Sequence, residues 1–305
     1  MTISSPRHFL ELRKIESIEL RQIVNLGISF KKGGPLPDTM DRLEGRVLAM
    51  IFEKPSTRTR VSFEVAMRQL GGTVIVLSSE DMQIGRGETI GDTARVLSRY
   101  VDAIMLRTTD EKKLVELADH SEVPVINGLT NNSHPCQLIA DIMTFEEYRG
   151  DITGKRIAWC GDGNNMARTW IEAAVAFSFE LWLACPEELM PSEDCLDWAK
   201  NKGAKVFHTE IPELAVEGAD CVVTDTWVSM GDKNLDRRRE LLYSYRVDEN
   251  LIKKANKDAI FMHCLPAHRD EEVSSEVLDG PRSAVWDEAE NRLYAQKGIL
   301  TWCLT

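Results

Sequence analysis

Two arginines and three hydroxyl side chains stand together in the segment Ser56-Thr57-Arg58-Thr59-Arg60. The segment follows an apolar run over 47–52, typical of a buried strand, and precedes an apolar pattern over 61–70 that predicts a helix. A helix N-terminus favours an anion, because unpaired backbone N–H groups and the helix dipole point there. Guanidinium groups add planar bidentate donors. We therefore expect this turn to bind an anion such as phosphate, with a capped helix and two solvated arginines as the alternative.

A histidine and a glutamine flank a second predicted helix start, in the stretch Asn131-Asn132-Ser133-His134-Pro135-Cys136-Gln137. Pro135 suits a first helical position, which places His134 at the N-cap and Gln137 on the first turn. Both side chains could contact a ligand there, His134 as a donor to a carbonyl oxygen and Gln137 through its amide. For an isolated His-Pro pair, an ordinary helix cap is the alternative.

Two polar segments follow strand patterns in the second half of the chain. The run Gly161-Asp162-Gly163-Asn164-Asn165-Met166 begins like a dinucleotide fingerprint, but Met166 replaces its third glycine. An NAD site is therefore weakly supported, and the two asparagines suit an amino-acid head group better. Asp225 follows the strand pattern at 221–224, where a carboxylate would hold a cation, and the run Ser229-Met230-Gly231 comes after it.

A thiol stands beside an imidazole in His263-Cys264-Leu265-Pro266, at the end of the last predicted strand. Adjacent strand residues point to opposite faces, which argues against a nucleophile pair. Cys264 could instead contact a ligand or accept a proton, and a buried core cysteine is the alternative.

Short apolar runs alternate with amphipathic segments along most of the chain. Strand patterns lie at 47–52, 73–77, 103–106, 123–127, 156–160, 181–185, 205–208, 221–224 and 259–263, and helix patterns include 92–100, 111–120, 135–148 and 290–304. This alternation predicts an α/β fold of two doubly wound parallel sheets with a boundary near Gly150. The expected domains are 1–149, joined by the terminal helix at about 290–305, and 150–289.

Polar segments directly follow six of these strand patterns, at 56–60, 107–108, 127–134, 161–165, 225–231 and 263–266. In open parallel sheets, ligands bind beyond the carboxyl ends of the strands. We therefore expect one active site in the cleft between the two domains.

Composition limits the classes of partner. The net charge of −12 over 305 residues argues against nucleic acid and anionic membrane surfaces. The first residues lack the apolar core of a signal peptide, and no apolar run reaches the ~18 residues of a membrane span. Seven cysteines without a C-x-x-C pair fit a reducing cytoplasm better than a disulfide framework. No His/Cys spacing typical of a structural metal site is present, so we expect no metal.

Taken together, these segments resemble the ornithine carbamoyltransferase family in order and in spacing. The S-T-R-T-R and H-P-C-Q segments resemble those shared among carbamoyltransferases, whereas S-M-G and H-C-L-P resemble the ornithine branch. The resemblance covers nearly the whole chain, including Asp92–Leu97 and Glu290–Arg292.

The resemblance implies a carbamoyl phosphate domain followed by an ornithine domain, without a metal or cofactor. Carbamoyl phosphate would contact Ser56, Thr57, Arg58, Thr59, Arg60, Gln83, Arg107, His134, Gln137, Cys264, Leu265 and Arg292, and ornithine would contact Asn165, Asp225, Ser229 and Met230. Gln83 resembles a residue that reaches into a neighbouring subunit's site, which implies a homotrimer or a multiple of trimers.

The implied reaction is attack of the δ-amine of ornithine on the carbamoyl carbon, giving citrulline and phosphate in arginine metabolism. Arg58, Arg107 and His134 would face the developing negative charge, with Cys264 near the amine. An alkyl amine has a pKa of ~10.4 and must lose a proton first, to Cys264, Asp225 or the phosphate. Another acceptor (aspartate, putrescine or an acylated ornithine), a phosphometabolite-binding protein and a dinucleotide enzyme are the alternative functions. The sequence carries no mark of metabolic direction.

Overall fold

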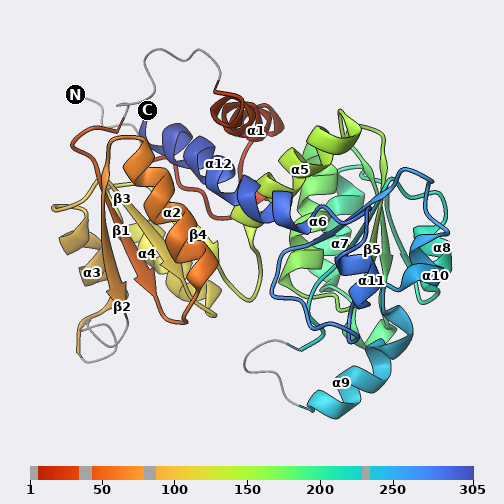
Figure 1. The fold of residues 1–305 in the computed structure, drawn as a ribbon. Coiled ribbons are helices and arrows are strands. Elements are labelled where there is room, and N and C mark those ends of the chain that lie inside the picture. The colour runs from red at the N-terminus through yellow and green to blue at the C-terminus, as the bar shows by residue number, and fades with distance from the viewer. Residues whose placement is uncertain (1–5, 34–42, 79–86, 229–233) are drawn as a thin grey trace. The chain divides into compact units, whose positions relative to one another are not determined.

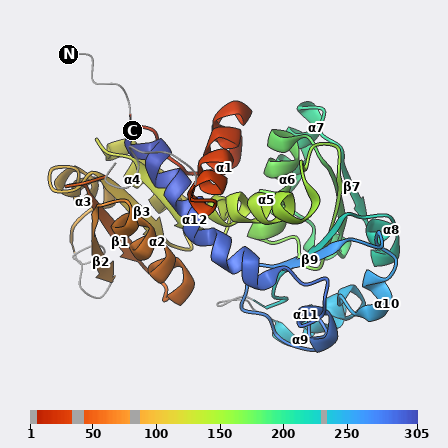
Figure 2. The same ribbon diagram turned by 45° about the horizontal axis from the view of Figure 1, so that its top comes forward.

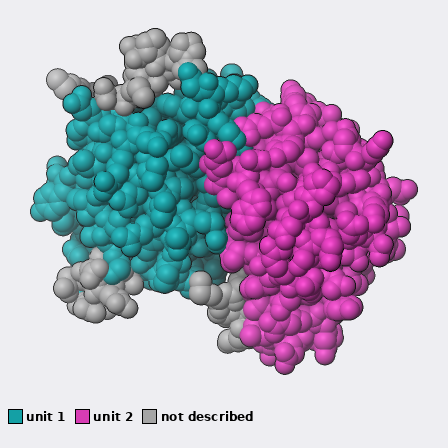
Figure 3. Space-filling view, in the orientation of Figure 1, with its two compact units in different colours: residues 1–140, 291–305 teal, residues 141–290 magenta. Residues whose placement is uncertain are grey.

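Two compact units make up the chain. A computed structural model describes residues 6–33, 43–78, 87–228 and 234–305. Unit 1 comprises residues 1–140 and 291–305, and unit 2 comprises residues 141–290 (Figure 3). The division falls within helix α5 (Pro135–Arg149) and helix α12 (Val285–Leu304), which both continue from one unit into the other. Each unit contains one wholly parallel sheet, as the alternating pattern predicted.

The sheet of unit 1 has the strand order β2-β1-β3-β4 (Figure 1). Its strands are β1 (Val47–Phe52), β2 (Thr73–Ser78), β3 (Ala103–Arg107) and β4 (Val125–Leu129). The chain winds outward from β1 in both directions, so the order reverses between β1 and β3. The amino-terminal segment extends the sheet beyond β4, because Phe9 donates its N–H to the Val125 carbonyl and accepts from Asn127 N–H, both at 2.8 Å.

Helices cover both faces of this sheet. They are α1 (Ser17–Lys31), α2 (Thr57–Gln69), α3 (Ile90–Leu97), α4 (Glu111–His120) and the parts of α5 and α12 that belong to the unit, with a 3-10 turn at Leu12–Lys14. On one face, Ala49 and Ile51 of β1 pack in a core cluster with residues of α3 and α4. Figures 1 and 2 show α2 on the other side of the sheet.

Helix α12 packs closely on α1. A Cβ atom added at Gly298 would lie 2.6 Å from the Ile23 carbonyl oxygen and 3.2 Å from the Gly27 nitrogen. A glycine at 298 therefore lets the two helix backbones approach. The aromatic rings of Phe9 and Trp302 also meet edge to face, with centroids 6.3 Å apart.

The sheet of unit 2 has the order β7-β6-β5-β8-β9. Its strands are β5 (Arg156–Cys160), β6 (Glu180–Ala184), β7 (Val206–Thr209), β8 (Cys221–Thr224) and β9 (Ile260–His263). The winding direction here reverses between β5 and β8. In a doubly wound sheet such a reversal opens a crevice at the carboxyl ends of the two strands, where ligands bind.

The helices of unit 2 again cover both faces. They are α6 (Asn165–Phe177), α7 (Glu193–Asn201), α8 (Pro212–Val216), α9 (Leu235–Leu242), α10 (Glu249–Ile252), α11 (Ser275–Leu278) and the remaining parts of α5 and α12, with 3-10 turns at Glu187–Leu189 and Tyr243–Tyr245. Helices α8, α10 and α11 bury one face in a cluster around Val222 and Phe261. Helices α6 and α7 lie on the opposite side (Figure 2). No helix within the described ranges is both long and apolar enough to cross a membrane.

Candidate active site

The segment Ser56–Arg60 forms the cap and first turn of α2. The helix begins at Thr57, earlier than the apolar pattern predicted, because the Ser56 hydroxyl accepts the Thr59 N–H at 3.4 Å and so caps the helix. A polar first turn contributes no apolar residues to the periodic pattern, so the pattern predicts a helix start later than the observed one. The backbone N–H groups of this turn lie at the carboxyl end of β1, beside the reversal in strand order. That position suits an anion.

A buried threonine joins two arginines from distant parts of the chain. Thr59 has 0% of its surface exposed, and its Oγ1 accepts hydrogen bonds from Arg107 Nη1 at 3.1 Å and from Arg292 Nη2 at 2.9 Å. Arg107 ends β3, and Arg292 lies on α12. One hydroxyl oxygen thus holds two guanidinium groups close together, which creates a local concentration of positive charge.

His134 lies within the field of these arginines. Its side chain is buried, and the pKa of its imidazole is lowered well below 6.5, first by burial and then by the charges of Arg292, Arg107 and Arg58. The imidazole is therefore neutral near pH 7, with one N–H to donate. As expected from the sequence, Pro135 begins α5 directly after it, and the buried Gln137 lies on the first turn of that helix.

The remaining residues of the predicted anion site differ in exposure. Arg58 is half-buried and contributes charge at His134, whereas Thr57 and Arg60 are exposed. The structure therefore brings together Arg58, Thr59, Arg107, His134 and Arg292, all within unit 1. Gln83 lies outside the described residues, so its expected role stays a prediction.

A second polar cluster lies in unit 2, at the carboxyl ends of β5, β8 and β9. Asn164 caps α6 through Oδ1, and its Nδ2 donates to Asp225 Oδ2 at 2.9 Å. Cys264 Sγ donates to the other carboxylate oxygen of Asp225 at 3.2 Å. Asn165, the asparagine named from the family resemblance, is the first residue of α6, directly beside this cap. The cluster flanks the strand reversal between β5 and β8, where an open α/β sheet binds ligands.

Cys264 and His263 have different hydrogen-bond partners, but alternation along a strand does not separate them, because β9 ends at His263 and their ligand atoms lie within 4.8 Å of each other. Burial, followed by the charge of Asp225, raises the pKa of the Cys264 thiol well above 9.0. His263 is fully buried, with Nε2 3.2 Å from Glu272 Oε1 and Nδ1 accepting the Leu265 N–H at 2.9 Å. Each side chain is engaged with a different partner, which argues against a nucleophile pair, and Cys264 stays a protonated thiol below pH 9 rather than the thiolate that could accept a proton.

Among the residues that the structure describes, two groups of side chains near the end of β9 could hold a metal ion. They are Asp225, His263 and Cys264 in one group, and His268, Glu271 and Glu272 in the other, with ligand atoms within 4.8 Å of one another in each. Linear spacing did not reveal the first group, because Asp225 is far from the other two residues in sequence. Ser229 and Met230 lie outside the described residues.

Several residues that support these clusters had no predicted role, although Asn127 begins the polar segment 127–134. Asn127 Nδ2 donates to the Leu10 carbonyl at 2.9 Å and to Ser133 Oγ at 3.0 Å, and so fixes the stretch before His134. Glu53 contacts both Thr108 and Lys113 beside the α2 cap. For Asn127, the available signal in the sequence was an asparagine inside an apolar strand. Nothing in the linear pattern pairs Glu53 with Lys113.

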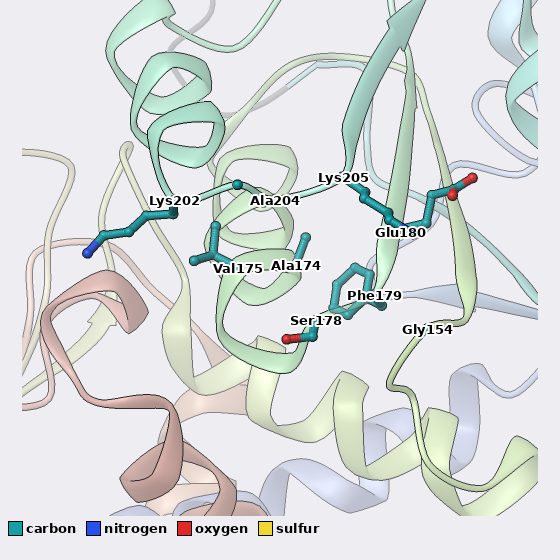
Figure 4. Close-up of a pocket in the computed structure, with 10 residues that line it drawn as sticks. Gly154, Ala174, Val175, Ser178, Phe179, Glu180, Lys202, Ala204 and Lys205 are labelled. Carbon is teal, nitrogen blue, oxygen red and sulfur yellow. The ribbon is translucent and has the colours of Figure 1, made fainter.

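A pocket of about 190 Å³ lies at the opposite end of the unit 2 strands (Figure 4). Gly154, Glu180 and Lys205, which line it, stand just before or at the starts of β5, β6 and β7. Its lining contains none of the predicted site residues, so it is separate from the cluster around Asp225.

Comparison with known proteins shows the family of the chain. The model of the carbamoyl-P binding domain of aspartate/ornithine carbamoyltransferases matches residues 7–147, and the model of their Asp/Orn binding domain matches residues 153–303. The chain belongs to the aspartate/ornithine carbamoyltransferase family. This confirms the family resemblance seen in the sequence. The anion cluster lies within the match to the first model, except for Arg292, and the Asp225 cluster lies within the match to the second.

Relatives within the family are similar over nearly their whole length. The chain is 58% identical to an ornithine carbamoyltransferase of Rhodopseudomonas palustris over 305 residues, which cover 98% of each protein. The solved structure of the Pyrococcus furiosus ornithine carbamoyltransferase has a TM-score of 0.93 and 46% identity, covering 98% of this chain and 97% of that one. The anabolic enzyme of Campylobacter jejuni has a TM-score of 0.91 and 39% identity, with coverage of 96% and 97%.

Proposed function

We propose that this protein transfers the carbamoyl group of carbamoyl phosphate to the δ-amine of L-ornithine, giving L-citrulline and phosphate. The observation that carries the proposal is the Thr59 hydroxyl, which holds Arg107 and Arg292 beside a neutral His134 at the start of α2. This arrangement combines charge for a phosphate with a neutral donor for a carbonyl oxygen.

In the proposed reaction, the guanidinium groups bind the phosphate and face the charge that develops as the carbonyl carbon becomes tetrahedral. Donors fixed before the reaction stabilise such charge without reorganising, and this stabilisation often contributes more to catalysis than any other effect. His134 donates from a neutral ring, because the nearby arginines keep its pKa low. The carbamoyl phosphate site would comprise Ser56, Thr57, Arg58, Thr59, Arg60, Gln83, Arg107, His134, Gln137, Cys264, Leu265 and Arg292.

The acceptor would bind at the Asp225 cluster of unit 2, through Asn165, Asp225, Ser229 and Met230. The Asp225 carboxylate suits an ammonium group of ornithine. The raised pKa of the Cys264 thiol favours a role in orienting the amine of ornithine over a role in removing the proton of that amine. The departing phosphate or Asp225 then takes the proton that the δ-amine must lose.

Ornithine is favoured over other acceptors by the relatives, which are named ornithine carbamoyltransferases at 58% identity. The test is to supply the purified protein with carbamoyl phosphate and, in separate assays, ornithine, aspartate or putrescine. We expect ureido product only with ornithine. Faster turnover with aspartate or putrescine would contradict the acceptor assignment, and absence of phosphate release with every amine would contradict the activity.

We propose further that the protein is a homotrimer or a multiple of trimers. Two features of unit 1 support a subunit interface: β2 lies at an open edge of the sheet, and apolar Ile75 and Val61 are 47% and 54% exposed. If Gln83 serves a neighbouring subunit, mixed Arg58→Ala and Gln83→Ala chains should regain activity, because a hybrid interface contains one intact site. Inactive hybrids, with mixed oligomers present by sedimentation, would contradict a shared site.

We also propose a cytoplasmic role in arginine biosynthesis. All seven cysteines are free thiols in the structure, which suits a reducing compartment. The anabolic Campylobacter jejuni enzyme supports the biosynthetic direction. Fractionation of cells with an antibody to the protein, and the growth of a deletion strain without arginine, test these two points.

A further inference from the structure

A carboxylate connects the elements that carry the proposed phosphate site. Glu53 follows β1 directly, and its N–H donates to the Arg107 carbonyl at 3.0 Å. Its Oε2 accepts a hydrogen bond from Thr108 Oγ1 at 2.5 Å, and its Oε1 lies 2.6 Å from Lys113 Nζ. Glu53 therefore joins the end of β1, the end of β3 and helix α4.

These contacts set the position of Arg107 relative to the α2 cap. Thr108 is buried and directly follows Arg107, so the Glu53 carboxylate holds the backbone from which that guanidinium extends. The Thr108 hydroxyl also accepts the Asp110 N–H at 3.1 Å, and Asp110 in turn caps α4. The segment that leads to the Ser56 cap and the end of β3 at Arg107 are thus held in fixed positions relative to each other.

The charge of Glu53 opposes the proposed ligand. The Glu53 carboxylate contacts Thr108, directly after the Arg107 that binds Thr59, so an uncompensated charge there would weaken the attraction of the cluster for a phosphate. Lys113 supplies the opposite charge, since its ammonium lies on the carboxylate and both side chains are partly shielded, at 37% and 20% exposure.

We propose that Glu53 is a positioning residue of the anion site, through its hydrogen bond to Thr108. Lys113 masks the charge of Glu53, so that this carboxylate does not weaken anion binding. The inference rests on the proposed function. The competing interpretation is an ordinary surface ion pair, which contributes little to stability and nothing to ligand binding.

Charge substitutions separate the two interpretations. Lys113→Met exposes the Glu53 charge, and we expect it to weaken the binding of carbamoyl phosphate about tenfold. Glu53→Gln combined with Lys113→Met removes both charges, and we expect most of the affinity to return. Lys113→Arg keeps the cation and should bind like the wild type. Lys112→Met is the matched control, because it removes an exposed lysine one position away on α4.

The measurements are calorimetric titration with carbamoyl phosphate, repeated with inorganic phosphate as a stable probe, and steady-state kinetics. For Lys113→Met, we expect the KM for carbamoyl phosphate to rise by about the same factor while kcat changes less than about threefold, because charge repulsion acts on binding. Glu53→Ala also removes the hydrogen bond from Thr108 to Glu53, and it should therefore lower kcat as well.

The inference would be overturned if Lys113→Met bound as tightly as Lys112→Met, or if the double variant bound as weakly as Lys113→Met alone. Failure of the proposed function can be distinguished from failure of this inference alone. In the first case the wild-type protein would bind no carbamoyl phosphate, and the inference would fail with the proposed function. Thermal unfolding of every variant shows whether the fold is intact. A loss of affinity that follows only the melting temperature would also count against the charge mechanism.

Discussion

Replacing Thr59 with valine tests whether one hydroxyl organises the anion site. Valine keeps the shape of the side chain but removes the oxygen that accepts from Arg107 at 3.1 Å and from Arg292 at 2.9 Å. A hydrogen bond from a charged donor contributes about 1.5–3 kcal/mol. Loss of two at the lower value, about 3 kcal/mol, corresponds to roughly a 150-fold fall in kcat/KM if both guanidinium groups then leave their places.

The matched control is Thr59→Ser, which retains Oγ but deletes a fully buried methyl group. We expect it to keep kcat/KM within a few-fold of the wild type while losing about 1 kcal/mol of unfolding free energy. Initial-rate kinetics and urea unfolding of both variants give the comparison. Full activity of Thr59→Val, or equal loss in both variants, would refute the role given to the hydroxyl.

Three other predictions concern protonation and packing. The folded-state pKa of His134 lies well below 6.5, so below pH 6.5 the unfolded chain binds a proton at this residue and the folded chain does not. The unfolding free energy should therefore fall on acidification by up to about 1.4 kcal/mol per pH unit. Urea titrations between pH 7 and pH 5 should show a smaller fall for His134→Gln. Because the pKa of Cys264 lies well above 9.0, Cys264→Ser should retain the wild-type pH–rate profile up to pH 9, and a shifted alkaline limb would show that the thiol titrates there. Gly298→Ala should lower the unfolding free energy by about 1–3 kcal/mol in chemical denaturation, since its Cβ would lie 2.6 Å from the Ile23 carbonyl oxygen, and unchanged stability would mean that the helices separate freely.

Some strands and helices have their predicted bounds, including α4 (Glu111–His120), and the differences have physical reasons. Buried strands in parallel sheets are continuous apolar runs, so β1, β5 and β8 have the predicted bounds. Helix ends depend on caps instead, and α2 begins before its apolar pattern because Ser56 caps it. Helix α1 was not predicted, although Leu20, Ile23, Val24 and Gly27 form a buried face at helical spacing.

Within the candidate site, motif residues were easier to identify than the residues that hold them. The anion turn and His134-Pro135 stand in short runs whose residue types indicate ligand chemistry. The pairs Glu53–Lys113 and Asn164–Asp225 join residues 60 and 61 positions apart. These residues meet because of the order of the strands and the connections between them. That order follows from the complete fold and is not visible in a local stretch of sequence.

The origin of Arg292 has a consequence for synthesis of the protein on the ribosome. Arg292 lies 233 residues after the threonine that it contacts, and residues 141–290 emerge between the two parts of unit 1. At about 5–20 residues per second, those residues take roughly 8–30 s to translate. Throughout that interval the nascent first unit lacks both the guanidinium of Arg292 and the helix that covers the α1 backbone at Gly27. The complete anion cluster therefore forms only after α12 has emerged, and a chain truncated before α12 lacks the contact between Arg292 and Thr59.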